Sequence, residues 1–267
     1  MSEAHPPREI AAAVESLGVA KARMNTVTLL ALGVLAGAFI SLGALFFTVV
    51  VTDTRVGFGL SRLLGGLAFS LGLVLVVVAG AELFTGNNLV AMAWVSRLVP
   101  TRDLLRNWAL SYTGNVIGCL GTVLFVVWSG VATLGNGAVG ETAVRIAEAK
   151  AGLSSSEAFM RGVLCNALVC MAVWLAMGGR SVTDKVLAVI FPITAFVAIG
   201  FEHSIANWFF LPFGFALSGG QEMPGAAVAR NLATVTAGNI VGGTLLVAGV
   251  YWVAYLRAGQ RMPPPRS

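Results

Sequence analysis

Two short segments of this sequence place ionisable and amide side chains where only apolar residues are expected. The first is Gly80-Ala81-Glu82-Leu83-Phe84-Thr85-Gly86-Asn87, and the second is Gly200-Phe201-Glu202-His203-Ser204-Ile205-Ala206-Asn207. Each segment follows a long apolar run, so its charged residues are expected near the middle of a bilayer. An ionisable side chain is costly there and marks a functional site by default. The repetition predicts a duplicated channel or transporter with its site between the two halves.

His203 is the residue best suited to chemistry. It is one of two histidines in the chain, and the other, His5, lies near the N-terminus. Because the pKa of histidine lies close to ambient pH, a histidine in a membrane passage can release and recover a proton. The alternative is a structural histidine held by hydrogen bonds. The position of His203 beside Glu202, within a repeated motif, supports the functional role, which the family resemblance given below then favours.

Glu82 and Glu202 are candidates either for carrying protons or for stabilising breaks in helices. Small and polar residues follow each glutamate, which predicts that two spanning helices are interrupted at membrane depth. A carboxylate at such a break can accept hydrogen bonds from the free backbone amides of the next half-helix. Two symmetric copies favour this structural role over a proton relay.

The composition indicates an all-α membrane protein with several spans. Apolar residues make up 57% of the chain and charged residues 11%, and the mean hydropathy is +0.85. A helix needs about 20 residues to cross the hydrocarbon core of a bilayer. Six apolar stretches meet this requirement, near residues 28–51, 63–95, 107–129, 159–177, 186–217 and 231–256. The second and fifth are overlong, as expected for interrupted helices.

The segments between the spans leave no room for a separate soluble domain. We expect a cytoplasmic N-terminal segment at 1–24, one six-span domain over 25–257 and a cytoplasmic C-terminal tail at 258–267. The N-terminal segment lacks the apolar region of a cleavable signal peptide. Its apolar spacing fits either a helix on the membrane surface or a soluble leader. The longest connection, 130–157, is short and rich in glycine.

The cysteines and the charges exclude further classes of function. Cys119, Cys165 and Cys170 fall within predicted spans without metal-ligand spacing, so neither a metal nor another cofactor is expected. Of the 17 Lys and Arg residues, 11 fall on the side of both termini. This bias places the termini in the cytoplasm and the 130–157 connection outside. The sequence has no basic run interleaved with aromatic residues, so nucleic-acid binding is not expected.

A second block of residues extends the internal repeat. Asn107, Gly114-Asn115 and Gly118 in the third apolar stretch are matched by Asn231, Gly238-Asn239 and Gly242 in the sixth. Each half then contains three spans, an odd number, so the halves must be inverted relative to each other. The Gly-Asn pairs fit close helix packing or, alternatively, a pore lining.

At these residues the chain resembles the formate–nitrite transporter family. The matching stretches, which extend over roughly residues 20–257, are Phe69-Ser70-Leu71-Gly72-Leu73, Ala81-Glu82-Leu83-Phe84-Thr85-Gly86, Gly114-Asn115, Cys165-Asn166-Ala167-Leu168-Val169-Cys170, Gly179-Arg180-Ser181, Phe201-Glu202-His203-Ser204-Ile205-Ala206-Asn207 and Gly238-Asn239. The resemblance implies an aquaporin-like protomer with two inverted three-helix repeats, interrupted second and fifth helices and its own pore. It also implies a homopentamer in the lipid bilayer of a bacterial cytoplasmic membrane.

The resemblance further assigns residues to the pore. His203 corresponds to the central pore histidine and Thr85 to its partner. The remaining assignments are hydrophobic constrictions at Phe69, Leu73 and Phe196, an outer-vestibule lysine at Lys150, and pore-side amides at Asn166 and Asn207. The segment Gly86-Asn87-Asn88 after Thr85 varies within the family and leaves the choice of anion open.

The expected function is the movement of a small monovalent weak-acid anion, with formate first and nitrite or hydrosulfide as alternatives. An anion that loses its hydration at apolar constrictions faces a high barrier. A proton from His203 would lower this barrier by forming the neutral acid; electrostatic attraction by protonated His203 is the other possible role.

Two rivals are less favoured. A neutral-solute channel would show Asn-Pro-Ala boxes, but no proline follows Asn87 or Asn207. An intramembrane hydrolase would need an activated serine. The sequence has no Gly-x-Ser-x-Gly elbow, and Ser204 directly follows His203. The sequence therefore predicts a transporter and not an enzyme.

Overall fold

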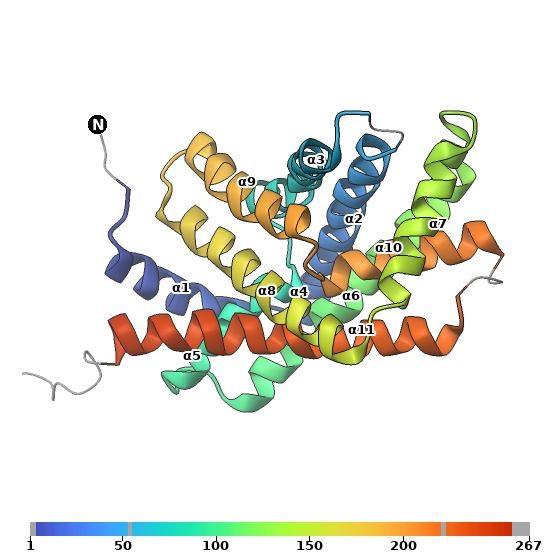
Figure 1. The fold of residues 1–267 in the computed structure, drawn as a ribbon. Helices are drawn as coiled ribbons and strands as arrows, with labels where there is room; N and C mark the ends of the chain where they lie inside the picture. The colour runs from blue at the N-terminus through green and yellow to red at the C-terminus, as the bar shows by residue number, and fades with distance from the viewer. Residues whose placement is uncertain (1–3, 53–54, 220–222, 258–267) are drawn as a thin grey trace, which may run out of the picture.

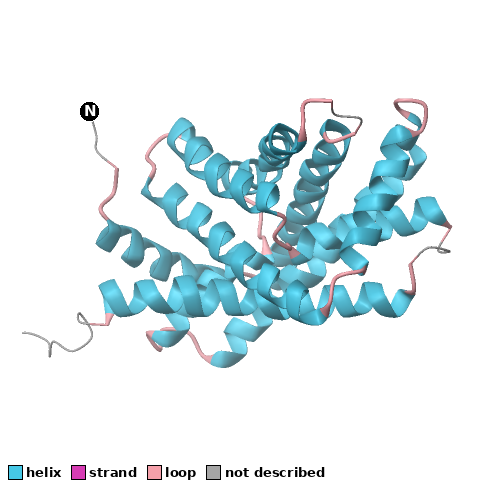
Figure 2. Cartoon of the chain, in the orientation of Figure 1, coloured by secondary structure: helices cyan, strands magenta, loops and turns pink. Residues whose placement is uncertain are grey.

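The computed structural model describes residues 4–52, 55–219 and 223–257, and every regular element in these ranges is a helix (Figures 1 and 2). The α-helices are α1 (Pro7–Ala22), α2 (Thr26–Val50), α3 (Phe58–Ala79), α4 (Phe84–Asn87), α5 (Ala91–Val95), α6 (Thr101–Trp128), α7 (Ala138–Ala151), α8 (Ser155–Gly178), α9 (Val182–Ile199), α10 (Ser204–Ser218) and α11 (Gly225–Val241). Short 3-10 helices are η1 (Asn88–Val90) and η2 (Val131–Thr133), and the π-helical η3 (Gly242–Gly249) and η4 (Trp252–Leu256) continue α11.

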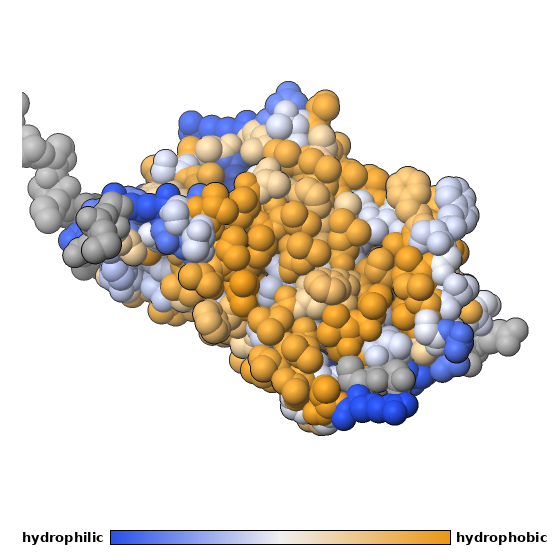
Figure 3. Space-filling model, turned by 90° about the horizontal axis from the view of Figure 1, so that it is seen from above, coloured by the Kyte–Doolittle hydropathy of each residue, from blue (hydrophilic) through white to orange (hydrophobic). Residues whose placement is uncertain are grey.

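The six-span fold predicted from the sequence is confirmed. Within the described ranges, six helices are long and apolar enough to cross a membrane: α2, α3, α6, α8, α9 and the continuous helix Gly225–Leu256. Each overlaps one of the six predicted stretches. Large apolar side chains cover much of the face shown in Figure 3, as expected for a surface in contact with lipid or with other subunits.

Both overlong stretches are interrupted, as predicted. The second span ends at Ala79 and a new helix begins at Phe84, while the fifth ends at Ile199 and a new helix begins at Ser204. Glycines follow each helix end, with φ of 83° at Gly80 and 87° at Gly200. This left-handed conformation is readily adopted only by glycine. The non-helical segments lie in the interior of the molecule, between the helices (Figure 2).

Two helices lie outside the six spans; one was not predicted, and the other was one of two alternatives for the N-terminal segment. The connection 130–157, expected to be a short glycine-rich loop, contains α7, which packs against α10 and α11. At the N-terminus, α1 packs against η1, α5 and α8 and buries Ile10 and Val14. The segment is therefore part of the folded body and not a free soluble leader. The expected C-terminal tail at 258–267 lies outside the described residues.

The two halves repeat the same packing. In the first half, α2 packs against α3 and α6; in the second, α8 packs against α9 and α11. Glycines allow the closest approaches: a Cβ atom added at Gly114 would lie 2.8 Å from the carbonyl oxygen of Leu30, and one at Gly162 would lie 2.9 Å from that of Val235. The glycines therefore serve close helix packing, one of the two interpretations of the Gly-Asn pairs.

Candidate functional site

An asparagine from α6 holds the first helix break. The Oδ1 atom of Asn115 accepts a hydrogen bond from the Phe84 backbone N–H at 2.8 Å, which caps the first free amide of α4. Its Nδ2 atom donates to the carbonyl oxygens of Gly33 at 2.8 Å and Glu82 at 2.9 Å. One buried side chain thus joins α2, the break and α6.

Asn239 makes the same three contacts in the second half. Its Oδ1 atom accepts from the Ser204 N–H at 2.8 Å, and its Nδ2 atom donates to the carbonyl oxygens of Gly162 at 2.8 Å and Glu202 at 3.0 Å. The amides at the breaks are therefore capped by asparagines and not, as predicted, by the glutamates. An amide side chain suits this position because its oxygen accepts from the backbone N–H that follows the break, while its nitrogen donates to a backbone carbonyl that precedes it.

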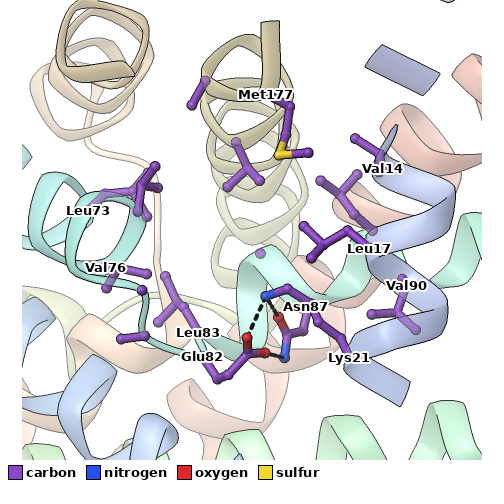
Figure 4. Close-up of a pocket in the computed structure, with 18 of the residues that line it drawn as sticks. Val14, Leu17, Lys21, Leu73, Val76, Glu82, Leu83, Asn87, Val90 and Met177 are labelled. Carbon is purple, nitrogen blue, oxygen red and sulfur yellow. Dashed lines mark hydrogen bonds and ion pairs between the residues drawn. The ribbon is translucent and has the colours of Figure 1, made fainter. Parts of the chain in front are cut away.

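Glu82 forms an ion pair with a residue of α1. Its carboxylate lies 2.8 Å from Lys21 Nζ and accepts a hydrogen bond from Asn87 Nδ2 at 2.8 Å (Figure 4). Lys21 also donates to Asn87 Oδ1 at 2.9 Å, and Asn87 Nδ2 lies 3.1 Å from Asn107 Oδ1. Every charge and amide in this network has a partner, as a polar cluster at membrane depth requires.

Glu202 forms the equivalent network with α7. Its carboxylate lies 2.9 Å from Lys150 Nζ and accepts from Asn207 Nδ2 at 2.7 Å. Asn207 also donates to Asn231 Oδ1 at 2.8 Å, and Asn231 donates to the Lys150 carbonyl at 2.7 Å. Lys150 is therefore a helix residue in an ion pair, with its side chain 15% exposed.

The two amides predicted to face the pore are fully buried. Asn166 is fully buried, and its Nδ2 atom lies 3.2 Å from the carbonyl oxygen of Thr85, 2.8 Å from Asn88 Oδ1 and 2.7 Å from the carbonyl oxygen of Asn239. Asn207 is equally buried, within the Glu202 network. Neither residue lines either of the two cavities described below. Asn166 thus bonds backbone carbonyls of both halves, and Asn207 bonds the carboxylate of Glu202.

The structure brings His203 and Thr85 together. His203 precedes α10, and its Nδ1 atom accepts a hydrogen bond from the Ala206 N–H at 3.0 Å. Its Nε2 atom lies 3.0 Å from Thr85 Oγ1, on the half-helix α4 of the other repeat. Since a backbone amide can only donate, Nδ1 carries no proton in this arrangement. The ring is therefore neutral, and its proton is on Nε2, facing Thr85.

Apolar side chains enclose this polar pair. The Phe196 ring stacks on the imidazole of His203, with centroids 6.0 Å apart and planes inclined by 21°. Phe69 meets Phe196 edge to face at 5.6 Å. Leu73, one turn after Phe69 on α3, is also buried. A hydrated ion has no room to keep its water among these side chains, so its hydration must be lost or replaced.

Two cavities lie near the helix breaks, one beside each, and they are named inner and outer after the orientation proposed below. The inner cavity, of about 280 Å³, is lined by Lys21, Glu82 and Leu73 together with apolar residues of α1 and α8 (Figure 4). The outer cavity, of about 200 Å³, is lined by residues that include Lys150 and His203, as well as Glu202, Phe69 and Phe196. The two cavities share no lining residue among the described part of the chain; Leu73 lines the inner one, and Phe69 and Phe196 line the outer one.

Sequence reasoning missed Lys21 as a partner of Glu82, although a signal was present. Lys21 and Lys150 each occupy the last turn of a short helix with acidic residues near its start. Extending the repeat toward the N-terminus of each half would have paired the two lysines. Arg62 and Arg161, which also line the outer cavity, were missed because nothing in the sequence distinguishes them from other basic residues near helix ends.

The fold has two inverted halves and two broken helices, and the His203–Thr85 pair lies among apolar side chains. These features define a membrane channel or transporter. The sequence matches the formate/nitrite transporter family over residues 8–253. It is 39% identical to the formate channel FocA of Escherichia coli (strain K12), in a match that covers 94% of each chain. The chain belongs to the formate/nitrite transporter family, and it is a transport protein rather than an enzyme.

Solved structures agree with this assignment. A pentameric formate channel with formate bound is 36% identical, with a TM-score of 0.77, and the match covers 87% of this chain and 98% of that one. An FNT family ion channel is 27% identical, with a TM-score of 0.83, and the match covers 92% and 98% of the two chains. The fold is thus that of the family along nearly its whole length.

Proposed function

We propose that this protein is a formate channel in which His203 exchanges a proton with the permeant acid. The observation that carries the proposal is the hydrogen bond between His203 and Thr85, placed between two cavities and enclosed by Phe69 and Phe196. The names of similar proteins support formate as the cargo. Nitrite and hydrosulfide are the alternatives, and the same flux assay compares them.

We further propose a homopentamer in a bacterial cytoplasmic membrane, with both termini in the cytoplasm. The pentameric assembly of a similar formate channel supports the first point. The distribution of Lys and Arg supports the second, because cytoplasmic loops carry an excess of both residues. In this orientation the outer cavity, with Lys150 and Glu202, faces the periplasm, and the inner cavity, with Lys21 and Glu82, faces the cytoplasm.

The apolar side chains of Phe69 and Phe196 explain why the transported solute should be a weak acid. A formate anion between Phe69 and Phe196 loses most of its hydration, whereas neutral formic acid has a much smaller desolvation cost. Thr85 and His203 offer the hydrogen-bonding groups at this point. Chloride cannot be neutralised by protonation at accessible pH, so the desolvation cost beside Phe69 and Phe196 should exclude it.

The tautomer of His203 constrains the proton step. A neutral imidazole that gave up its Nε2 proton would become an anion, which is unfavourable in an apolar site. The donor must therefore be the imidazolium, and its formation requires a proton on Nδ1 and the loss of the hydrogen bond from Ala206. The arriving anion favours this cationic form by direct attraction. Proton exchange is thus coupled to the presence of the permeant.

Two substitutions of His203 test the proposal. Purified protein in liposomes is assayed for formate flux and anion current over a series of pH values. His203→Phe should abolish formate flux without dissociating the assembly, because the bulk of the ring is retained. His203→Gln offers an N–H donor that cannot titrate, so it should also lack flux if a proton is exchanged.

The outcomes separate the possible roles. Wild-type flux that rises on external acidification with little current supports proton exchange. Full flux through His203→Gln but none through His203→Phe would reduce His203 to a hydrogen-bond donor. Unchanged flux in both variants would remove His203 from the transport site.

A further inference from the structure

We propose that Arg106 and Arg230 are positioning residues for transport, each holding the end of a short helix so that the lysine of that helix stays on the glutamate of a helix break. Arg106 holds α1, which carries Lys21, and Arg230 holds α7, which carries Lys150. The consequence for flux rests on the proposed function, whereas the placement of the two lysines can be measured without it.

The two arginines occupy equivalent positions in the internal repeat. Each directly precedes an asparagine of the repeated block, in Arg106-Asn107 of α6 and in Arg230-Asn231 of α11. The repeat therefore extends one residue further than the asparagines alone indicate. A basic residue at the same place in both halves points to a role that both halves share.

Arg106 binds the backbone where α1 ends. Its Nη1 and Nη2 atoms donate to the carbonyl oxygen of Met24 at 3.1 Å and 3.0 Å, and Nη1 lies 3.5 Å from the carbonyl oxygen of Ala22. Beside it, Asn107 Nδ2 donates to the carbonyl oxygen of Lys21 at 3.0 Å. Two consecutive residues of α6 thus bind three carbonyl groups at the end of α1.

Arg230 binds the equivalent end of α7. Its Nη2 atom donates to the carbonyl oxygens of Ala151 at 3.1 Å and Leu153 at 3.3 Å. The next residue, Asn231, donates from Nδ2 to the carbonyl oxygen of Lys150 at 2.7 Å. In each half, the three acceptors are therefore the carbonyl group of the lysine and those of the residues one and three positions after it.

These contacts cap the short helices from outside. The last carbonyl groups of a helix have no partner within it, and a basic side chain at this end binds them and is favoured by the helix dipole. With 16 residues in α1 and 14 in α7, both are close to the length of about 12–15 residues at which an isolated helix is marginal in water. Their positions therefore depend on contacts of this kind with the spanning helices.

Each capped helix forms part of the wall of one cavity. The last two turns of α1, with Lys21, line the inner cavity, and the last turns of α7, with Lys150, line the outer cavity. The two lysines lie 2.8 Å and 2.9 Å from their glutamates. In the described part of the chain, neither Arg106 nor Arg230 is among the residues that line these cavities. The arginines therefore act through the helices that they hold.

The reactivity of the two lysines measures their placement without any transport. The assembled protein is treated briefly with an amine-acetylating reagent, and the acetylation rates of Lys21 and Lys150 are measured by mass spectrometry. A lysine held in an ion pair reacts slowly. Arg106→Gln should raise the rate at Lys21 about tenfold and leave Lys150 unchanged. Arg230→Gln should raise the rate at Lys150 alone, by about threefold, because Arg230 is exposed and its bonds are weaker.

Two matched controls remove the same charge from the same helices. Arg102 is exposed and lies one turn before Arg106 on α6. Arg145 lies on α7, in an exposed pair with Glu141 at 3.7 Å. Arg102→Gln and Arg145→Gln should leave the acetylation rates of both lysines at the wild-type values. If Arg106→Gln does not assemble, Arg230→Gln carries the test, because the second half uses the same carbonyl positions.

Formate flux from each side tests the consequence for transport. Arg230→Gln should raise the half-saturating formate concentration about twofold on the side of the outer cavity, and Arg106→Gln on the side of the inner cavity, with maximal flux little changed. A general loss of folded protein would instead lower maximal flux from both sides.

The outcomes separate this inference from the proposed function. Unchanged acetylation of Lys21 in Arg106→Gln and of Lys150 in Arg230→Gln would overturn the inference, even if the wild type conducts formate. Equal increases at both lysines in either variant would overturn it too. Lysine-specific changes without any change in flux would overturn the role in transport. Lysine-specific changes in a wild type that moves no formate would sustain the placement of the lysines and overturn the proposed function.

Discussion

His203, in the second half, donates a hydrogen bond to Thr85, in the first half, beside Phe69 and Phe196. Its geometry depends on hydrogen bonds from neighbouring residues to both partners. Asn166 and the Cys170 thiol both approach the carbonyl oxygen of Thr85, at 3.2 Å and 3.4 Å. The Ala206 amide fixes the other end by binding Nδ1 of His203. The site is therefore preorganised, and small changes in it should affect transport more than stability.

Thr85→Val tests the threonine hydroxyl at constant shape. The loss of this partner should lower formate flux about tenfold, equivalent to ~1.4 kcal/mol, the value of one good hydrogen bond. Thr122→Val is the control, since Thr122 bonds the carbonyl oxygen of Gly118 within its own helix. Initial rates of formate uptake into liposomes give both values. Equal rates in Thr85→Val and wild type would show that the hydroxyl takes no part in permeation.

The helix breaks are the elements on which the site is built, and their glutamates should behave alike. Glu82→Gln and Glu202→Gln each leave a partly buried lysine without its counter-charge. Removing one partner of a buried pair is strongly destabilising; with the lysines 20% and 15% exposed, we expect a loss of about 2 kcal/mol in each variant. Thermal unfolding of the detergent-solubilised assembly measures it.

Glu141→Gln provides the comparison, because its pair with Arg145 is exposed and its loss should change stability little. Suppose instead that one of the two break variants abolished flux in a stable assembly while the other had no effect. The shared structural role of Glu82 and Glu202 would then be wrong.

The sequence predicted the spans and their breaks, because apolar length and polar interruption are properties of single segments. It did not predict α7, and it offered a helix in the N-terminal segment only as one alternative, without the packing of α1 into the molecule. Each is shorter than a membrane span, and each is stabilised by burying one face, with Val14 in α1 and Val139 and Ala143 in α7. Packing of this kind depends on neighbours distant in the chain. The repeated motif singled out His203 and the family resemblance paired it with Thr85, but the buried positions of Asn166 and Asn207 required the fold.

At the scale of the whole molecule, the orientation in the membrane decides which cavity meets the outside. Ser155 and Thr183 are exposed and lie at opposite ends of the α8–α9 hairpin. Ser155→Cys should react with an impermeant thiol reagent in intact cells, and Thr183→Cys only after lysis, because the charge bias places 130–157 outside. Labelling of Thr183→Cys alone in intact cells would invert the assignment of the two cavities.

The matched networks of the two halves also indicate that the chain contains an internal duplication. Each half carries a lysine, a glutamate and three asparagines in the same arrangement, as Lys21, Glu82, Asn87, Asn107 and Asn115 in the first and Lys150, Glu202, Asn207, Asn231 and Asn239 in the second. A frame shared by two inverted halves is the pattern that duplication of a half-length unit produces. Positions 83 and 85 hold Leu and Thr, whereas 203 and 205 hold His and Ile. The scaffold is thus repeated in both halves, while the residues of the His203–Thr85 pair differ between them.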